Sequence, residues 1–458
     1  MKSRQYQKRI QQYRHRLAAL PAHREALDAC LEEKASGQGT EMPESEDICS
    51  EVFLHTLAPA LVEYVKWVLL EAKTHAIGRL YFVARDGYMM YHVAQIMNHA
   101  WHLGLDLRYL QISRHAIRSA EYYFIGDKAL DTICVGGIDI TFTKLMKRAS
   151  LSEPEIMQMA LLTGMELEMD VALSYGRIQS LKQKLSEIPA FMELIRDHAG
   201  NAYQSTTEYL LRQGLTEATT YALVDSGWIG TLQLSLQRVL SHMTGRDIKL
   251  TGYYFGIYEQ PKGTRKGQYC SFYFAPGNIW RKSRFSNCMF EVIFSAPEGM
   301  TLGYASGEAI TSTQKNPNAA LISRLTEEIE RYTREYVNHT RNLQQNHRRT
   351  IRMLRRLLVP LMTAPTRDEA REMGKLPFCD DVLEQGLMPL AANWSMEDLR
   401  NQKFLSKVLI KANRKKGILR ESAWPEGSMT NLVAHPGNAI RQEHLYRYLM
   451  YIRKAMKK

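Results

Sequence analysis

The chain has 458 residues, a hydrophobic fraction of 45%, a charged fraction of 24% and a formal net charge of +12. These fractions are ordinary for a globular protein, and the length allows two or three domains. No apolar run approaches the ~20 residues that cross a bilayer, and the charged start of the chain carries no secretory signal. The six cysteines form no C-x-x-C pair. We therefore expect a cytoplasmic protein without a zinc site, a disulfide framework, or a haem or nicotinamide motif.

Basic residues gather near the two ends of the chain, which makes the charge uneven. Such a distribution is compatible with nucleic acid, an anionic membrane surface or phosphorylated substrates. Solvated helix faces are the simpler interpretation. We keep a protein partner or an acidic surface for the basic C-terminal helices as a hypothesis, whereas a nucleic-acid role rests on net charge alone. The main basic positions are Lys2, Arg4, Lys8, Arg9, Arg14 and Arg16, then Arg348, Arg349, Arg352, Arg355 and Arg356, and finally Lys411, Arg414, Lys415, Lys416, Arg453, Lys454, Lys457 and Lys458.

The N-terminal region predicts helices that lead into a first strand. Leucines at helix-like spacing predict a basic helical arm over 1–35, and small and polar residues predict a linker over 35–45, so 1–40 is treated as arm and linker. A helix is expected over 52–76 and a buried strand from Leu80. The α/β ligand-binding domain is predicted to cover 41–310.

Two segments, Leu80–Tyr88 and Tyr221–Thr231, share one pattern. Each is a short apolar run that stops at a charged residue followed by glycine, after which a helical pattern resumes. Such a turn places backbone N–H groups and the positive end of a helix dipole at the carboxyl edge of a sheet. Ligands bind at that edge in open α/β sheets, and they are often phosphorylated. We therefore predict that the two turns form one site.

The remaining elements complete an α/β fold with a mostly parallel sheet. A strand is expected over 107–112, and 115–215 carries helical patterns that indicate an insertion or cap. Strands over 220–225 and 250–258 flank a helix over 231–242, and 261–304 predicts antiparallel strands or ordered loops. Beyond residue 315 helices are predicted, including a long arginine-rich helix over 319–358, so 311–458 is expected to be a basic helical C-terminal domain.

The first turn offers groups for both a phosphate and a sugar. Ala84 and Gly87 allow the backbone to approach a ligand closely, and Arg85 can grip a phosphate with two hydrogen bonds. Asp86 could accept from sugar hydroxyls, hold a metal, or cap the next helix. Arg114, after the strand over 107–112, would add a second arginine at the same edge.

The second turn resembles a phosphate cradle in its chemistry. Asp225 ends the strand, Ser226, Gly227 and Gly230 shape the turn, and Thr231 begins the helix with a hydroxyl. The turn is not a Walker A loop, because no lysine follows the second glycine. Trp228 could stack on a base or a sugar, or it could be a packing wedge. Asp225 or Asp86 could hold Mg²⁺, which is the one cofactor that we consider.

Several other polar residues carry weaker signals. His115 and Arg118 are expected to face solvent or to cap a helix. Glu291 and Glu298 could act as acid and base only if their loop folds over the site, whereas a helix that ends at Ala296-Pro297 explains them without function. The turn Trp424–Gly427 is interpreted as structural.

The segments 81–88, 112–114, 224–231, 294–299 and 424–427 resemble a bacterial group associated with surface-polysaccharide synthesis, whose members are labelled haloacid-dehalogenase-like hydrolases. The similarity covers roughly 50–310. Haloacid dehalogenases need a D-x-D-x-T nucleophile motif, which occurs nowhere in this chain. In the group that motif belongs to a separate N-terminal domain. The resemblance therefore ranks a hydrolase last, since the phosphoaspartate route has no nucleophile.

The order of elements is also similar to that of type I phosphoribosyltransferases, a Rossmann-like layout. That resemblance implies that Ala84–Gly87, assisted by Arg114, hold diphosphate, that Gly227, Gly230 and Thr231 hold the sugar phosphate, and that Asp225 contacts sugar hydroxyls. Those enzymes usually carry two adjacent acids where this chain has Asp225 and Ser226.

Our leading hypothesis is an enzyme that binds a phosphorylated sugar or nucleotide-sugar and transfers the sugar with loss of diphosphate in surface-polysaccharide metabolism. In it Arg85, Asp86 and Asp225 do the catalytic work. The alternative is a non-catalytic module that binds a phosphate ligand or a partner.

Overall fold

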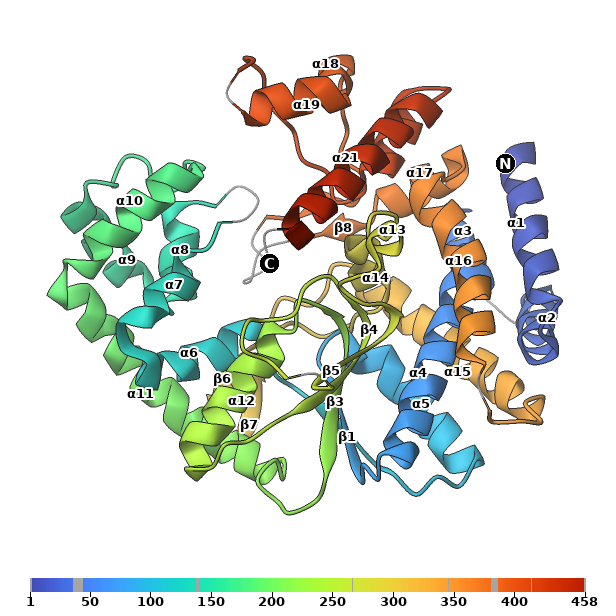
Figure 1. The fold of residues 1–458 in the computed structure, drawn as a ribbon, viewed down its shortest axis with the longest axis horizontal. Helices are drawn as coiled ribbons and strands as arrows, with labels where there is room; N and C mark the ends of the chain where they lie inside the picture. Colours follow the sequence, from blue (N-terminus) through green and yellow to red (C-terminus); the bar gives the residue numbers. More distant parts are fainter. Residues whose placement is uncertain are drawn as a thin grey trace.

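A five-stranded parallel sheet organises the computed structural model, which describes residues 2–35, 44–136, 140–265, 267–344, 346–379, 386–412 and 414–456. The strand order is β2-β1-β3-β4-β5, and every neighbouring pair runs parallel (Figure 1). This confirms the predicted α/β class with a parallel sheet. The strands are β1 (Arg79–Val83), β2 (Asp106–Leu110), β3 (Tyr221–Trp228), β4 (Thr251–Ile257) and β5 (Tyr269–Phe274).

Helices cover both faces of the sheet, which explains why its strands are continuous apolar runs. Successive side chains of a strand point to opposite faces. Leu80 and Phe82 of β1 therefore enter the core beneath α4 (Ala58–Thr74) and α5 (Gly87–Ala100). Tyr81 and Val83 enter a second core beneath α6 (Arg114–Ile125) and α12 (Thr231–Thr244).

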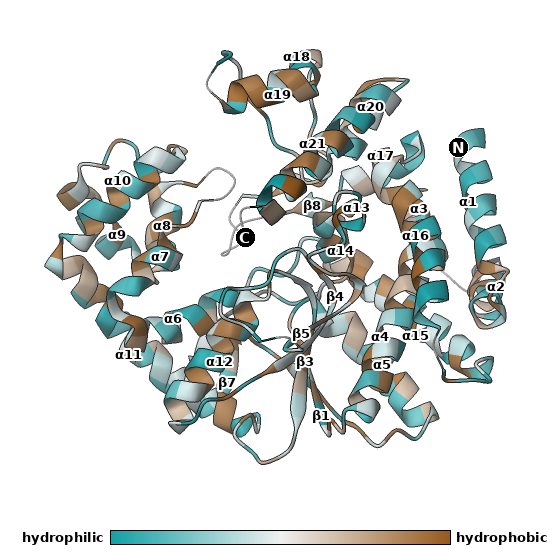
Figure 2. Ribbon diagram, in the orientation of Figure 1, coloured by the Kyte–Doolittle hydropathy of each residue, from teal (hydrophilic) through white to brown (hydrophobic). Residues whose placement is uncertain are grey.

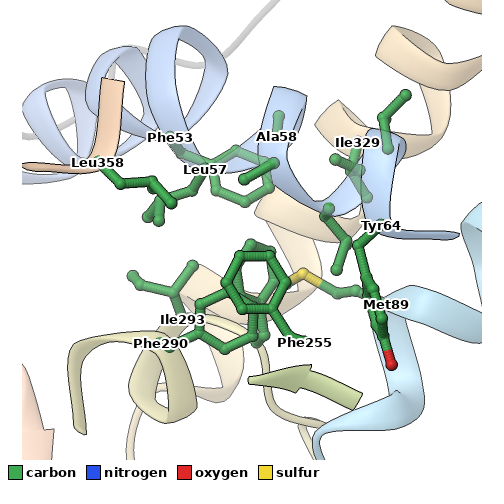
Figure 3. Close-up of a cluster of buried hydrophobic side chains, with 14 of the residues drawn as sticks. Phe53, Leu57, Ala58, Tyr64, Met89, Phe255, Phe290, Ile293, Ile329 and Leu358 are labelled. Atoms are coloured by element: carbon green, nitrogen blue, oxygen red, sulfur yellow. The ribbon is translucent and has the colours of Figure 1, made fainter. Parts of the chain in front are cut away.

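The larger core joins segments from the whole length of the chain. Figure 3 shows Phe53, Tyr64, Phe255, Phe290 and Leu358 packed together, although they come from widely separated elements. The two N-terminal helices belong to the same core, since Tyr6 and Tyr13 are fully buried. The predicted arm is thus two helices. Of the predicted linker over 35–45, residues 36–43 lie outside the described residues. The elements are α1 (Arg4–Leu17), α2 (Pro21–Ala35), α3 (Glu44–Val52), η1 (Phe53–Leu57), α15 (Ala319–Asn338) and α16 (His347–Thr363).

Contrary to the expectation from the sequence, one helical stretch, Asp47–Thr74, is long and apolar enough to cross a membrane by length and composition. Its most apolar window is 94% buried inside the protein, as in the core helix of a globular domain. The stretch contains Tyr64, whose hydroxyl donates to the carbonyls of Asp225 and Tyr253 at 2.9 and 2.7 Å. It therefore supports the sheet directly behind the site described below.

The segment between β2 and β3 is helical, as predicted for 115–215. Its helices have a hydrophobic core of their own around Phe142, Ile156, Leu185 and Phe191. Figure 1 shows these helices projecting from one side of the sheet. After α6 they are η2 (Gly126–Lys128), α7 (Ala129–Ile133), α8 (Phe142–Arg148), α9 (Glu153–Thr163), α10 (Tyr175–Ser186) and α11 (Pro189–Arg212).

Two predictions about the later part of the chain are wrong in part. The region 261–304 contributes β5, which pairs parallel to β4 instead of forming an antiparallel strand or a loop. Among the described residues, antiparallel pairing joins β6 (Thr301–Ala305), which begins inside the predicted region, to β7 (Glu308–Thr311), and it also joins the two-residue strands at 377–378 and 388–389. The predicted helix over 319–358 is two helices, because α15 ends at Asn338 and the Asn346 side chain caps a new helix by accepting from the Arg349 N–H at 3.1 Å.

The C-terminal region is mainly helical and packs against the end of the sheet. Trp424 is fully buried, and its Nε1 donates to the Met362 carbonyl at 2.9 Å, which agrees with its structural interpretation. The remaining elements are α13 (Ile279–Lys282), α14 (Asn287–Ile293), α17 (Arg367–Gly374), β8 (Pro377–Phe378), β9 (Met388–Pro389), α18 (Met396–Asn401), α19 (Phe404–Lys411), α20 (Pro425–Leu432) and α21 (Gly437–Met456).

Candidate functional site

A cavity of about 510 Å³ opens at the carboxyl ends of β1 and β3. The loop after β1 and the end of β3 form its floor, and the two predicted turns therefore share one cavity. The strand order reverses between these two neighbouring strands, which is where open α/β sheets bind ligands. Its lining includes Ala84, Arg85, Asp86, Arg114, Asp225, Gly227, Trp228, Gly230, Thr231, Glu259, Glu291, Tyr451 and Lys454.

The first turn, Ala84–Asp86, is held tightly against β1. Gly87 opens α5, and a Cβ there would lie 2.9 Å from the Phe82 carbonyl carbon, so only glycine fits. The Ala84 N–H donates to the Leu110 carbonyl at 2.9 Å, and the Ala84–Arg85 peptide is cis. Asp86 makes no side-chain cap to α5. Its carboxylate instead accepts from the Ser226 hydroxyl.

The second turn begins later than predicted, because β3 continues through Gly227 and Trp228. Both residues still pair with β4, opposite Gly256 and Ile257. A Cβ on Gly227, at φ +137°, would lie 2.1 Å from the Gly256 carbonyl oxygen. The actual turn is Ile229-Gly230, and Gly230 at φ +71° precedes the first residue of α12, Thr231. The N-terminus of α12 thus faces the cavity.

Two half-buried carboxylates meet across Ser226. Its hydroxyl donates to Asp86, and its N–H donates to Asp225 Oδ1 at 2.8 Å. Burial raises the pKa of Asp86, although the Ser226 hydroxyl and the charges of Arg85 and Arg114 oppose that shift. Burial and the charge of Asp86 raise the pKa of Asp225 well above its usual value. Two carboxylates with raised pKa values are stabilised when they share one proton or when a positively charged group binds between them.

Two arginines lie close to these carboxylates, and a third, Arg118, contacts the start of α12. Arg85 is half-buried, and burial lowers the pKa of its guanidinium, which lies close to Asp86. Arg114 begins α6 and is exposed, and its charge lowers the pKa of both Asp86 and Asp225. Arg118 does not face solvent as expected, because its Nη2 donates to the Thr231 hydroxyl at 3.3 Å. The site therefore combines opposite charges within one cavity.

His115 also departs from its expected solvent or cap role. The side chain is partly buried next to Arg114. Burial lowers the pKa of His115 to about 4, so the imidazole is neutral at physiological pH. The cap of α6 is Ser113, whose hydroxyl accepts from the Ala116 N–H at 3.0 Å and donates to the Thr301 carbonyl at 2.7 Å.

Trp228 is a packing residue in this structure. Its side chain is 9% exposed and lies among aromatic rings, with centroids 5.2 Å from Phe285 and 5.6 Å from Phe290. Its Nε1 donates to the Glu291 carboxylate. The ring holds α14 against the end of β3, and it leaves little surface for stacking on a ligand.

Of the two carboxylates that were predicted to act as acid and base if their loop folds over the site, only Glu291 lines the cavity. It lies on α14, inside a helix that ends at Ile293. Glu298 accepts from the Tyr109 hydroxyl at 2.8 Å. The predicted acid and base are thus held by different partners.

The C-terminal helix α21 forms one wall of the cavity. The sequence did not predict this wall. Tyr451 stacks on Tyr258 with centroids 5.8 Å apart, and Lys454 Nζ lies 2.9 Å from Glu259 Oε1. No local pattern links these residues to a site some two hundred positions earlier. The basic C-terminus was the only available signal.

The donor set fits Mg²⁺ only together with a ligand. Among the described residues no group of three or more His, Cys, Asp or Glu side chains could hold a metal ion. Mg²⁺ is commonly bound by one or two carboxylates plus substrate phosphates. Asp86 and Asp225 could supply the two carboxylates.

Comparison of the sequence with models of protein families and with curated proteins finds no match.

Proposed function

We propose that this cavity binds a phosphorylated sugar or a nucleotide-sugar and that the protein transfers the sugar with release of the diphosphate, or nucleoside diphosphate, that is attached to it. The observation that carries the proposal is the meeting of two carboxylates, two arginines and a helix N-terminus in one cavity. The arginines and the helix N-terminus can bind phosphate groups, whereas the carboxylates can accept hydrogen bonds from sugar hydroxyls.

The strand order supports this proposal. In sheets of order 2-1-3-4-5 the ligand crevice lies between the first and third strands, and the cavity occupies that position. We extend the proposal to a phosphoribosyltransferase-like arrangement of the site. In it Gly230 and Thr231 bind the sugar phosphate, and Ala84–Gly87 bind the diphosphate.

Each polar group then has a separate task. Arg85 and Arg114 stabilise the negative charge that develops on the leaving diphosphate. Asp225 orients the sugar hydroxyls, and Ser226 holds Asp86 and Asp225 in fixed positions. Asp86 and Asp225 are the residues that would hold Mg²⁺, which would supply further charge neutralisation.

The proposed reaction breaks the bond between the sugar carbon and a diphosphate oxygen. An acceptor that carries a hydroxyl or amine forms the new bond to that carbon, and its proton passes to a carboxylate of the Asp86–Asp225 pair. Raised pKa values suit this step, because a carboxylate with a higher pKa is a stronger base.

Calorimetry with phosphoribosyl diphosphate and with nucleotide-sugars, with and without Mg²⁺, tests the binding step. We expect binding of at least one of them and a loss of about tenfold or more in affinity for Arg85→Ala, since charged hydrogen bonds are worth about 1.5–3 kcal/mol. Arg246→Ala changes an exposed arginine on the loop after α12 and serves as the matched control. Absence of binding to every ligand would contradict the proposal.

One observation favours the non-catalytic alternative. Ser226 occupies the place of a second acid, and its hydroxyl engages Asp86. If the protein is an enzyme, Asp225→Asn abolishes turnover while ligand binding is partly retained. If the protein only binds, wild type shows no turnover with any acceptor, and Asp225→Asn changes affinity alone.

A further inference from the structure

A basic face lies on α16, away from the residues that line the cavity. Its five arginines follow the spacing i, i+1, i+4, i+7 and i+8, which places them on one side of a helix. All five are exposed, whereas Ile351, Leu354 and Leu357 on the other side are buried in the main core. The helix contains no acidic residue. The arginines are Arg348, Arg349, Arg352, Arg355 and Arg356.

Helix α1 extends this face. It also contains no acidic residue, and it lies alongside α16 (Figure 1). The Arg16 guanidinium donates to the Arg356 carbonyl, and Arg349 Nη2 lies 3.5 Å from the Ala19 carbonyl. Figure 2 shows both helices with hydrophilic residues on their outer sides. The two helices therefore present one continuous cationic surface.

The arginines of this face have like charges as neighbours. Burial, followed by the charges of Arg9 and Arg356, lowers the pKa of Arg16 against the opposing effect of Tyr13. Within the described part of the chain, none of the five arginines of α16 forms an ion pair with an acidic side chain. On α1, Arg14 does pair with Asp28, at 2.7 Å. The crowded charges that lack acidic partners are those of α16; they cost folding free energy, and a polyanionic partner would lower that cost.

An exposed aromatic residue adjoins the arginines. Trp280 of α13 is 41% exposed, and the guanidinium carbons of Arg284 and Arg355 lie 4.3 and 5.4 Å from its ring centroid. Tyr448 of α21 is 36% exposed and lies close enough to Arg284 to affect its pKa. Tryptophan and tyrosine favour the headgroup region of a bilayer.

We infer that this face, which we call the α1–α16 face, docks on an anionic lipid surface. Arginine forks bind lipid phosphates with two hydrogen bonds, and clustered arginines are attracted to the negative potential of such a surface. A nucleic acid would gain from stacking a base on Trp280. Two guanidinium groups already lie over that ring, so the exposed part of the indole is better placed to enter a headgroup layer.

Co-sedimentation with vesicles tests the inference on the full-length protein. Vesicles of phosphatidylcholine alone are compared with vesicles that also contain phosphatidylglycerol, at low and at high salt. We expect binding only to the anionic vesicles, and weaker binding at high salt. The variant R348E/R352E should lose about tenfold or more in apparent affinity. The control R196E/R246E makes the same charge change at exposed arginines of α11 and the loop after α12 and should bind like wild type.

A second readout follows Trp280 itself. Binding to anionic vesicles should shift the tryptophan emission to shorter wavelength in wild type, and W280F should lose most of that shift while keeping its circular dichroism spectrum. The inference is overturned if anionic vesicles do not bind at low salt, or if R348E/R352E and the control lose binding equally. Tighter binding to an oligonucleotide, lost in the same variant, would overturn it in favour of nucleic acid.

Discussion

Ser226 and Asp86 are joined by a hydrogen bond from the serine hydroxyl across 140 residues of sequence. The N–H of the same serine donates to Asp225 at 2.8 Å, so one buried residue positions both carboxylates of the cavity. This contact joins the loop after β1 to the end of β3. It makes the two turns one site.

Ser226→Ala is expected to lower the free energy of unfolding by about 1–3 kcal/mol, because Asp86 loses a hydrogen bond to its charged form in a half-buried place. Urea unfolding at neutral pH measures the change. Ser180→Ala, at an exposed serine of α10, should change stability by less than about 0.5 kcal/mol. Equal effects of the two substitutions would mean that the hydroxyl contact contributes nothing.

Asp225→Asn is expected to stabilise the protein at alkaline pH while impairing ligand binding. The pKa of Asp225 is raised in the folded state, so its contribution to stability is fully present below the unfolded pKa and is lost as pH rises through the folded pKa. Asparagine removes the buried charge, and we expect a gain of about 1 kcal/mol near pH 8. Melting curves between about pH 4 and pH 8 should show this gain shrinking toward acid pH. Parallel profiles for the two proteins would contradict the assignment.

Gly227→Ala is expected to destabilise the protein by about 2 kcal/mol or more. A Cβ would lie 2.1 Å from the Gly256 carbonyl oxygen, and φ is +137°. Either β3 and β4 separate or the backbone rotates, and both cost free energy. Gly277→Ala, where a Cβ meets open space, is the control in denaturant unfolding. A variant as stable as the control would show that the two strands can part without cost.

Glu426→Gln is expected to lower stability by about 3 kcal/mol at neutral pH. Glu426 is buried and binds both His444 and Arg447 of α21. Burial opposes its charge, but Arg447 and His444 hold the pKa of Glu426 at about 2. Without that charge the half-buried Arg447 guanidinium is less well paired.

The pH dependence of Glu426→Gln has a definite sign. A lowered pKa contributes stability above the unfolded pKa and loses it as pH falls through the folded pKa. The difference from wild type should therefore be full above about pH 4.5 and should disappear toward about pH 2. Chemical unfolding at several pH values measures it, with Glu421→Gln at an exposed position as control. A deficit that persists at acid pH would argue against the ion pair.

Local patterns were enough for the elements that build the floor of the site. The apolar run before Asp86 and the glycine that follows it predicted β1 and α5, and Thr231 was correctly predicted to begin α12. These features depend on neighbours in sequence, since burial periodicity and glycine conformations act over a few residues. The end of β3 was predicted three residues early, because pairing of Gly227 and Trp228 with β4 is not a local property.

By itself, the sequence determined an α/β protein with two glycine turns at strand ends, because strand, turn and helix preferences are written in adjacent residues. The tertiary structure alone decided that β5 runs parallel to β4 and that Tyr451 and Lys454 close the cavity. It also placed Ser226 between two carboxylates. Strand direction and contacts between distant segments depend on the path of the whole chain and on how its cores pack, and no short stretch of sequence encodes that path.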